Sequence, residues 1–227
     1  MAHTIGALDS IVNGSSSPVT GTVVVAAGET VLVVMLSVVS ATNRAGGALT
    51  YGSQTMTQAG STQKAASSPE CSAELWYLID PVVGSATLTI PNTGSLNLGY
   101  LAARAKAPAG GKSKFSAAWG SNGTSTNPSC GSGALPSGGN IVFAVVASGA
   151  TTWAPSARTG TLIADVDAGA AGAGTQYLIV NAPVPQGQEM AWTFGTSDDW
   201  GACAAAFSEV PAIAMNNYVM GVGDREL

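Results

Sequence analysis

The chain is poor in charged residues. Of its 227 residues, 13 are acidic and 8 are basic, a charged fraction of 9%, whereas soluble domains average about 25%. Eight cations and an isoelectric point near 4.6 exclude the broad basic face of a nucleic-acid-binding protein. The same shortage of Glu, Lys and Arg excludes a coiled coil. Hydrophobic residues, at 46%, exclude the composition of a disordered protein.

Histidine and cysteine are also scarce. The single histidine, His3, lies in an N-terminal segment that we expect to be mobile, a poor place for the base of a Ser-His-Asp or Cys-His site. The cysteines, Cys71, Cys130 and Cys203, form no CxxC pair, so zinc and redox motifs are excluded. We expect three reduced, partly buried thiols, and neither a catalytic centre nor a cofactor.

Targeting and membrane signals are missing as well. The first residues contain neither the basic nor the apolar region of a secretory signal. The longest apolar run, at 31–39, is far shorter than the roughly 20 residues of a membrane helix. We expect a protein made in a cytoplasm, with neither a membrane nor nucleic acid as partner.

Runs of β-branched and aromatic residues, separated by Gly, Ser and Thr, dominate the chain. Residues 31–39 and 141–147 are apolar at successive positions, which predicts strands covered on both faces. Residues 86–90 and 190–194 alternate, which predicts strands with one buried face. Residues 48–57 predict a hairpin that turns at Gly52 and Ser53. The alanine-rich run 202–207 is interpreted as a further strand.

These runs predict an all-β fold: a two-sheet antiparallel β-sandwich, jelly-roll-like, of about ten strands. We expect one domain over residues 1–210. Each half of the chain holds an apolar strand, loop-rich connections and an alternating strand. This similarity fits either a weak duplication or simply two sheets.

The residues that follow Val210 and Pro211 are predicted to form a C-terminal extended arm, 211–227. Proline disfavours further sheet pairing, and the arm is apolar enough to be costly in water. It either folds back on its own domain or reaches a neighbouring subunit. Its expected interface residues are Ile213, Met215, Tyr218, Val219 and Met220.

Half of the basic charge lies within eleven residues of the middle of the chain, at Arg104, Lys106, Lys112 and Lys114. One hypothesis is a patch that docks on an acidic partner surface. The alternative is a solvated loop, since four cations are too few for strong phosphate-driven binding.

Acidic pairs and tryptophans offer weaker candidates. Asp165 with Asp167, and Asp198 with Asp199, could bind calcium or act on a sugar, although ending a strand is the simpler interpretation. Among the tryptophans, Trp76 and Trp192 are predicted to be core residues. The others lie near loops, where a carbohydrate-binding surface is conceivable: Trp119, Trp153 and Trp200.

Several segments resemble a β-sandwich module of bacteriophage virion proteins and some bacterial surface proteins. They are residues 49–57 (LTYGSQTMT), 73–81 (AELWYLIDP), 84–90 (GSATLTI), 190–194 (MAWTF) and 199–207 (DWGACAAAF). The likeness extends, with gaps, over about residues 20–210. It implies a virion component, either a head decoration protein or a tail accessory protein.

The expected function is therefore structural and non-enzymatic: a capsid decoration (cement) protein on the outer surface of a phage head. Its partners would be the major capsid protein or other virion subunits, and a homo-oligomer is expected, with a trimer plausible from the resemblance. The alternative is a carbohydrate- or receptor-binding β-sandwich module of a phage tail or bacterial surface protein. A hydrolase would need converging carboxylates, which the sequence does not support.

Overall fold

The computed structural model describes residues 3–14, 18–39, 44, 47–65, 71–91, 97–108, 111–131, 135, 140–149, 156–157, 159–167, 172–180 and 188–210. Each regular element in these ranges is a β-strand, and paired strands run antiparallel. The all-β class and the antiparallel sandwich are confirmed. The arm, 211–227, and its five expected interface residues lie outside the described residues.

The first half of the chain builds an inner sheet around a strand that is apolar on both sides. In spatial order its strands are β1 (Thr4–Gly14), β10 (Asn97–Lys106), β3 (Val31–Val39) and β8 (Cys71–Ile79), followed by the short β6 (Thr57–Gln58) and β7 (Gln63–Lys64). β3 pairs along its whole length with both neighbours. Its position in mid-sheet, between two other layers, explains why residues 31–38 are all buried.

An outer sheet covers one face of this inner sheet. It consists of β2 (Val19–Val25), β9 (Gly84–Ile90), β4 (Thr50–Tyr51) and β5 (Gln54–Thr55). Leu88 and Ile90 point inward and are fully buried, whereas Thr87 is exposed, as the alternation predicts. β4 and β5 form the predicted hairpin, in which Gly52 has a φ of +54° that favours glycine.

The second half repeats this arrangement. Its inner sheet contains β11 (Lys112–Ser125), β18 (Asp198–Val210), β13 (Asn140–Ser148), β16 (Gly172–Val180) and β15 (Thr161–Asp167). Its outer sheet contains β12 (Ser129–Gly131), β17 (Glu189–Thr193) and β14 (Ser156–Ala157).

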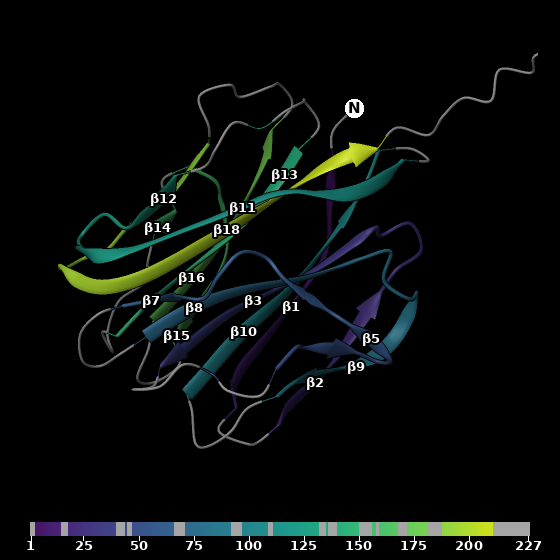
Figure 1. Ribbon diagram of the computed structural model, residues 1–227, viewed down its shortest axis with the longest axis horizontal. Coiled ribbons are helices and arrows are strands. Elements are labelled where there is room, and N and C mark those ends of the chain that lie inside the picture. Colours follow the sequence, from purple (N-terminus) through teal and green to yellow (C-terminus); the bar gives the residue numbers. More distant parts are fainter. Residues whose placement is uncertain are drawn as a thin grey trace, which may run out of the picture.

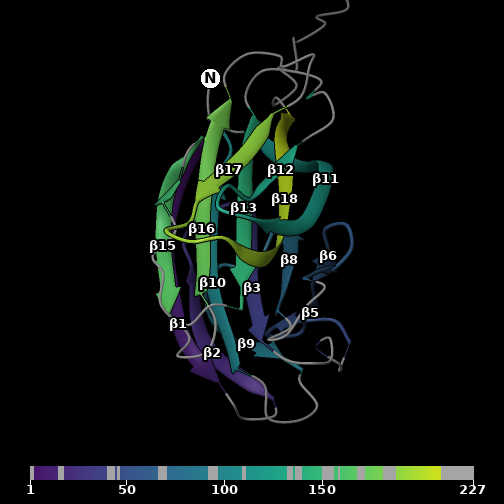
Figure 2. The same cartoon turned by 90° about the vertical axis from the view of Figure 1, so that its left-hand side faces the viewer.

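The described strands thus stack as four layers, with the two inner sheets face to face (Figures 1 and 2). Three apolar clusters fill the three gaps. The central cluster joins β3, β8 and β10 to β13 and β18, and each flanking cluster joins one inner sheet to its own outer sheet. The described part of the chain thus builds the antiparallel sandwich from two pairs of sheets that share a central core.

Both halves have the connectivity of a jelly roll. When β6 and β7 of the first half are left out, each half has eight described strands, which we number along the chain within that half. In both halves, neighbouring strands of the inner sheet are then the first, eighth, third and sixth, and neighbouring strands of the outer sheet are the second, seventh and fourth. This order is what two Greek keys folded into a double sheet produce. Of the two interpretations left open by the sequence, the structure favours duplication, because the same path is followed twice.

Small side chains let the inner sheets approach each other. β18 lies in mid-sheet with a layer on each face, and every residue from Gly201 to Ser208 is buried. Cys203, Ala205 and Phe207 point into the central cluster, while Ala202, Ala204 and Ala206 point to the outer sheet. This double burial explains why an alanine-rich run that favours helix by propensity is a strand here.

We expect Ala205→Leu to lower the free energy of unfolding by about 1–3 kcal/mol, because the larger side chain overpacks the central cluster. Ala205 is fully buried and lies opposite Ala118 and Phe143 on its two neighbouring strands. Urea unfolding measures the change. Ser85→Leu, at an exposed position of β9, is the control and should change stability by less than about 0.5 kcal/mol. Equal effects of the two substitutions would contradict this packing.

Candidate functional site

The four basic residues expected to form a patch separate in the structure. Lys106, Lys112 and Lys114 are exposed at the end of β10 and the start of β11. Arg104 is instead 1% exposed and lies in the interior. Its expected place in a surface patch is therefore corrected: it faces the outer-sheet side of β10, where carboxylates of the first half are available.

The buried Arg104 guanidinium forms ion pairs with one partly exposed and one buried carboxylate. Its Nη1 lies 2.6 Å from Asp9 Oδ2 on β1, and its Nε lies 3.7 Å from Glu29 Oε2. Glu29 in turn accepts a hydrogen bond of 2.8 Å from the backbone N–H of Ala26. A guanidinium excluded from water needs such partners, so this group stabilises the join between β1, β10 and the turn before β3.

A surface pocket of about 440 Å³ lies where the lysines gather. It is lined by Gly28, Thr30, Asp80, Lys106, Ala107, Gly111 and Lys112. Lys112 Nζ lies 2.7 Å from Asp80 Oδ2, and both side chains are largely exposed, so the pair is screened by water. Lys106 carries the second positive charge of the wall, which leaves the pocket with a net positive charge.

A buried chain of hydroxyl contacts lies behind this pocket. His3 is 1% exposed, and its Nε2 lies 3.0 Å from Ser113 Oγ. Ser113 Oγ lies 2.6 Å from Thr30 Oγ1, which accepts a hydrogen bond from the Ala107 backbone N–H. The expectation of a mobile histidine is wrong, because contacts between residues 110 positions apart hold it. Ser113 is also buried, so this series of contacts connects the two halves of the protein and does not present a nucleophile.

The last described residue, which precedes the expected arm, lies beside the same pocket. Val210, the last residue of β18, pairs with Lys112, and Ser208 pairs with Lys114. Val210 and Phe115 are 40% and 37% exposed, high values for large apolar side chains. The structure therefore places the start of β11 beside the end of β18, about 100 residues later in the sequence. We call Lys106, Lys112, Lys114 and Val210 the lysine corner.

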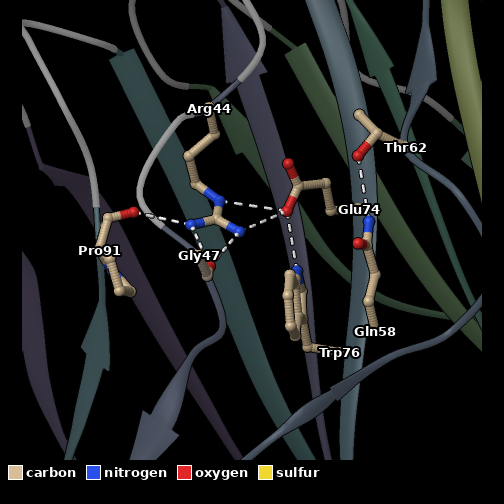
Figure 3. A network of polar contacts seen from close by, with 7 residues as sticks. All are labelled: Arg44, Gly47, Gln58, Thr62, Glu74, Trp76 and Pro91. Carbon is tan, nitrogen blue, oxygen red and sulfur yellow. Dashed lines mark hydrogen bonds and ion pairs between the residues drawn. The ribbon is translucent and has the colours of Figure 1, made fainter.

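A second polar network, which the sequence analysis missed, pins a loop to the inner sheet (Figure 3). Arg44 donates through Nε and Nη2 to Glu74 Oε2, at 3.1 and 3.0 Å. Both side chains are at most 3% exposed. The same carboxylate oxygen accepts a hydrogen bond of 2.8 Å from Trp76 Nε1.

The rest of the guanidinium binds backbone carbonyls. Arg44 Nη1 donates to Pro91 O at 2.7 Å, and both terminal nitrogens donate to Gly47 O at 3.1 Å. Its Cζ lies 5.3 Å from the centre of the Trp76 ring, within reach of a cation–π contact. The network is structural, because the donors of Arg44 are occupied in this way and its side chain is almost completely buried. A buried Arg followed at a distance by Glu-x-Trp gives no local signal in the sequence.

Of the two acidic pairs, the structure describes the side chains of one, Asp198 and Asp199. Asp165 and Asp167 lie on β15, but their side chains are outside the described residues. Asp198 accepts a hydrogen bond from Ser148 Oγ, and Asp199 accepts one from Thr124 Oγ1. Within the part of the chain that the structure describes, no three His, Cys, Asp or Glu side chains are grouped so as to hold a metal ion.

The described tryptophans lie in the core or pack against it. Trp76 and Trp192 are buried, as predicted. Trp200, expected near the surface, is only 6% exposed and donates from Nε1 to Ser125 Oγ. Trp119 is partly buried and donates to the Cys130 carbonyl. Trp153 lies outside the described residues.

The three cysteines are free and buried, as expected. Burial is the largest cause, and the nearby Asp198 the second, that raises the pKa of Cys71 to about 12. Burial is also the largest cause of the raised pKa values of Cys130 and Cys203. Thiolate is the reactive form of cysteine. These thiols are therefore packing groups at neutral pH.

The described residues contain no helix long and apolar enough to cross a membrane. Comparison with protein-family models, curated proteins and solved structures finds no match to this chain. The likeness to phage virion modules therefore stays a prediction.

We expect Glu74→Gln to lower the free energy of unfolding by about 3–5 kcal/mol, because the Arg44 guanidinium would lose its buried counter-charge. Adding Arg44→Met should restore part of this loss, since no buried charge remains and the amide oxygen still accepts from Trp76. Lys112→Gln, in the exposed pair with Asp80, is the control and should cost less than about 1 kcal/mol. Denaturant unfolding of the four proteins distinguishes a buried clamp from an ordinary ion pair.

We expect stability to fall as the pH rises above about 9. The unfolded chain ionises its thiols near the ordinary pKa of 9.0, while folded Cys71 keeps its proton up to a pKa of about 12. Protons are thus released on unfolding in this interval, and the stabilisation present below pH 9 is lost toward pH 12. Urea unfolding at pH 7, 9 and 10 measures the slope. Cys71→Ala should make it shallower, and an unchanged slope would exclude Cys71 as a source.

Proposed function

We propose that this chain is a structural, non-enzymatic bacteriophage virion protein that decorates the outer surface of the head. The observation that carries the proposal is the lysine corner. It combines exposed positive charge, the exposed apolar side chain of Val210 and the position in the sequence from which a 17-residue apolar arm follows. These are the elements of a docking surface, in which charge guides encounter and apolar burial supplies most of the affinity.

The chemistry of the described side chains supports a contact role. The single histidine contacts a buried serine, the Arg44 and Arg104 guanidinium groups are held in buried ion pairs, and the thiols are buried. A nucleophile with an accessible base is the minimum for covalent catalysis. The polar groups named here act within the fold instead.

The four-layer fold supports a role in reinforcing a shell. Each inner sheet is packed on both faces, so the described body is a stiff block. A stable interface buries about 1,600 Å² in total, and an arm of this length would supply much of one side. In the proposed mechanism the arm spreads over capsid subunits while the lysine corner lies on an acidic part of their surface.

Truncation after Val210 should abolish binding to heads that lack the protein, while the body stays folded, because the arm supplies the apolar interface. Co-sedimentation with the particles measures binding, and circular dichroism with thermal unfolding checks the fold. Co-sedimentation of the truncated chain to the same extent as the full chain would contradict the proposal.

The charge of the corner can be tested separately. The combination of Lys106→Glu and Lys114→Glu should weaken head binding and reduce its salt dependence. Lys64→Glu on β7 makes the same kind of charge change outside the corner and is the control.

A second candidate function is favoured by the pocket. Its size and its two lysines would accept an acidic sugar, such as a glycan that carries a carboxylate, in a receptor-binding module. Binding of the isolated protein to acidic glycans on an array, lost in Lys106→Glu, would favour this function over decoration.

A further inference from the structure

The free edge of β11 differs from the other edges of the inner sheets. Edge strands carry unpaired N–H and C=O groups, and proteins protect them with charges, bulges, proline or short length. β6 and β7 are two residues long. β1 has two register irregularities and carries Asp9, and β15 has one irregularity and carries two aspartates.

β11 lacks these protections over most of its length. From Ala117 to Ser125 its pairing with β18 is unbroken, and the eleven residues from Phe115 to Ser125 include neither charge nor proline. In Figure 2, β11 lies at the right-hand side of the molecule. β7 packs beneath it: Gln63 lies against Gly120 and Gly201, on the face turned toward the other inner sheet. This packing covers one face of β11. The outer edge of the strand pairs with no described strand.

Charge is distributed unequally between the two ends of this strand. Lys112 and Lys114 lie at its start, where Ser113 pairs with Glu209 of β18, so these three charges sum to one positive charge. At its end, Thr124 and Ser125 pair with Asp199 and Asp198 of β18. In an antiparallel pairing of β11 with a second β11, the basic end of each copy would lie beside the acidic end of the other. Such a pairing is attractive at both ends, whereas a parallel pairing would place like charges together.

We propose that β11 is a homodimerisation edge, at which two copies of this chain pair antiparallel about a twofold axis. The pairing joins two five-stranded inner sheets into one continuous ten-stranded sheet. It uses backbone hydrogen bonds for affinity and the uncharged side chains of residues 115–125 for close approach. A twofold axis brings the same patch of each copy together, which suits a strand whose two ends have opposite charge. The proposal does not depend on the location of the protein in a virion.

Sedimentation velocity over a range of concentrations tests the dimer. We expect a reversible dimer of the wild-type chain, and an Asn122→Lys variant whose dimerisation constant is weaker by roughly tenfold, because twofold symmetry places the added charge in the interface twice. Thr87→Lys adds the same charge at an exposed position of β9, in the interior of an outer sheet, and should dimerise as the wild type does.

Two further measurements separate this edge from other interfaces. Hydrogen exchange of the amides of β11 should slow as concentration rises, while that of the β1 amides stays constant. The chain truncated after Val210 should still dimerise. A wild-type chain that stays monomeric, a trimer, dimerisation lost with the arm, or an Asn122→Lys variant that pairs like the wild type would each overturn the proposal.

Discussion

The packing of two inner sheets against each other is the interaction on which the rest of the molecule depends. The central cluster takes side chains from both halves of the chain, including Val33, Leu75, Phe143 and Phe207. Because each inner sheet is also covered on its far face, β3 and β13 have no side exposed to water. Burial of apolar area is the main stabilising term in folding, and here it requires both halves to be present.

This double burial explains the unusual places of the polar groups. Charged side chains within the layers must be paired, since an unpaired buried charge is costly. Arg44 with Glu74 fixes the loop before β4 to β8, and Arg104 with Asp9 and Glu29 joins β1 to β10. The His3–Ser113–Thr30 contacts tie the start of the second half to the first. A chain with few charges uses several of them inside.

The consequence for function is that contact chemistry is left to edges and corners. The faces of the inner sheets are covered, and the proposed contacts therefore lie at the lysine corner and along the edge strand β11. The corner lies at the beginning of β11, and the proposed dimer edge runs from there to Asp198 and Asp199. One strand therefore connects the proposed site of particle binding to the proposed site of self-association.

The sequence by itself determined the local structure. The period of two in residues 86–90, the apolar runs at 31–39 and 141–147, and the Gly52–Ser53 turn predicted strands and a hairpin that the structure confirms. These signals are local, because side chains alternate along a strand whatever it pairs with. The doubling of the sandwich, the burial of His3, Arg104 and Trp200, and the meeting of Lys112 with Val210 were decided only by the tertiary structure. They depend on contacts between segments about 100 residues apart. A local pattern of hydrophobic and polar residues does not specify which distant strand will pair with a given strand.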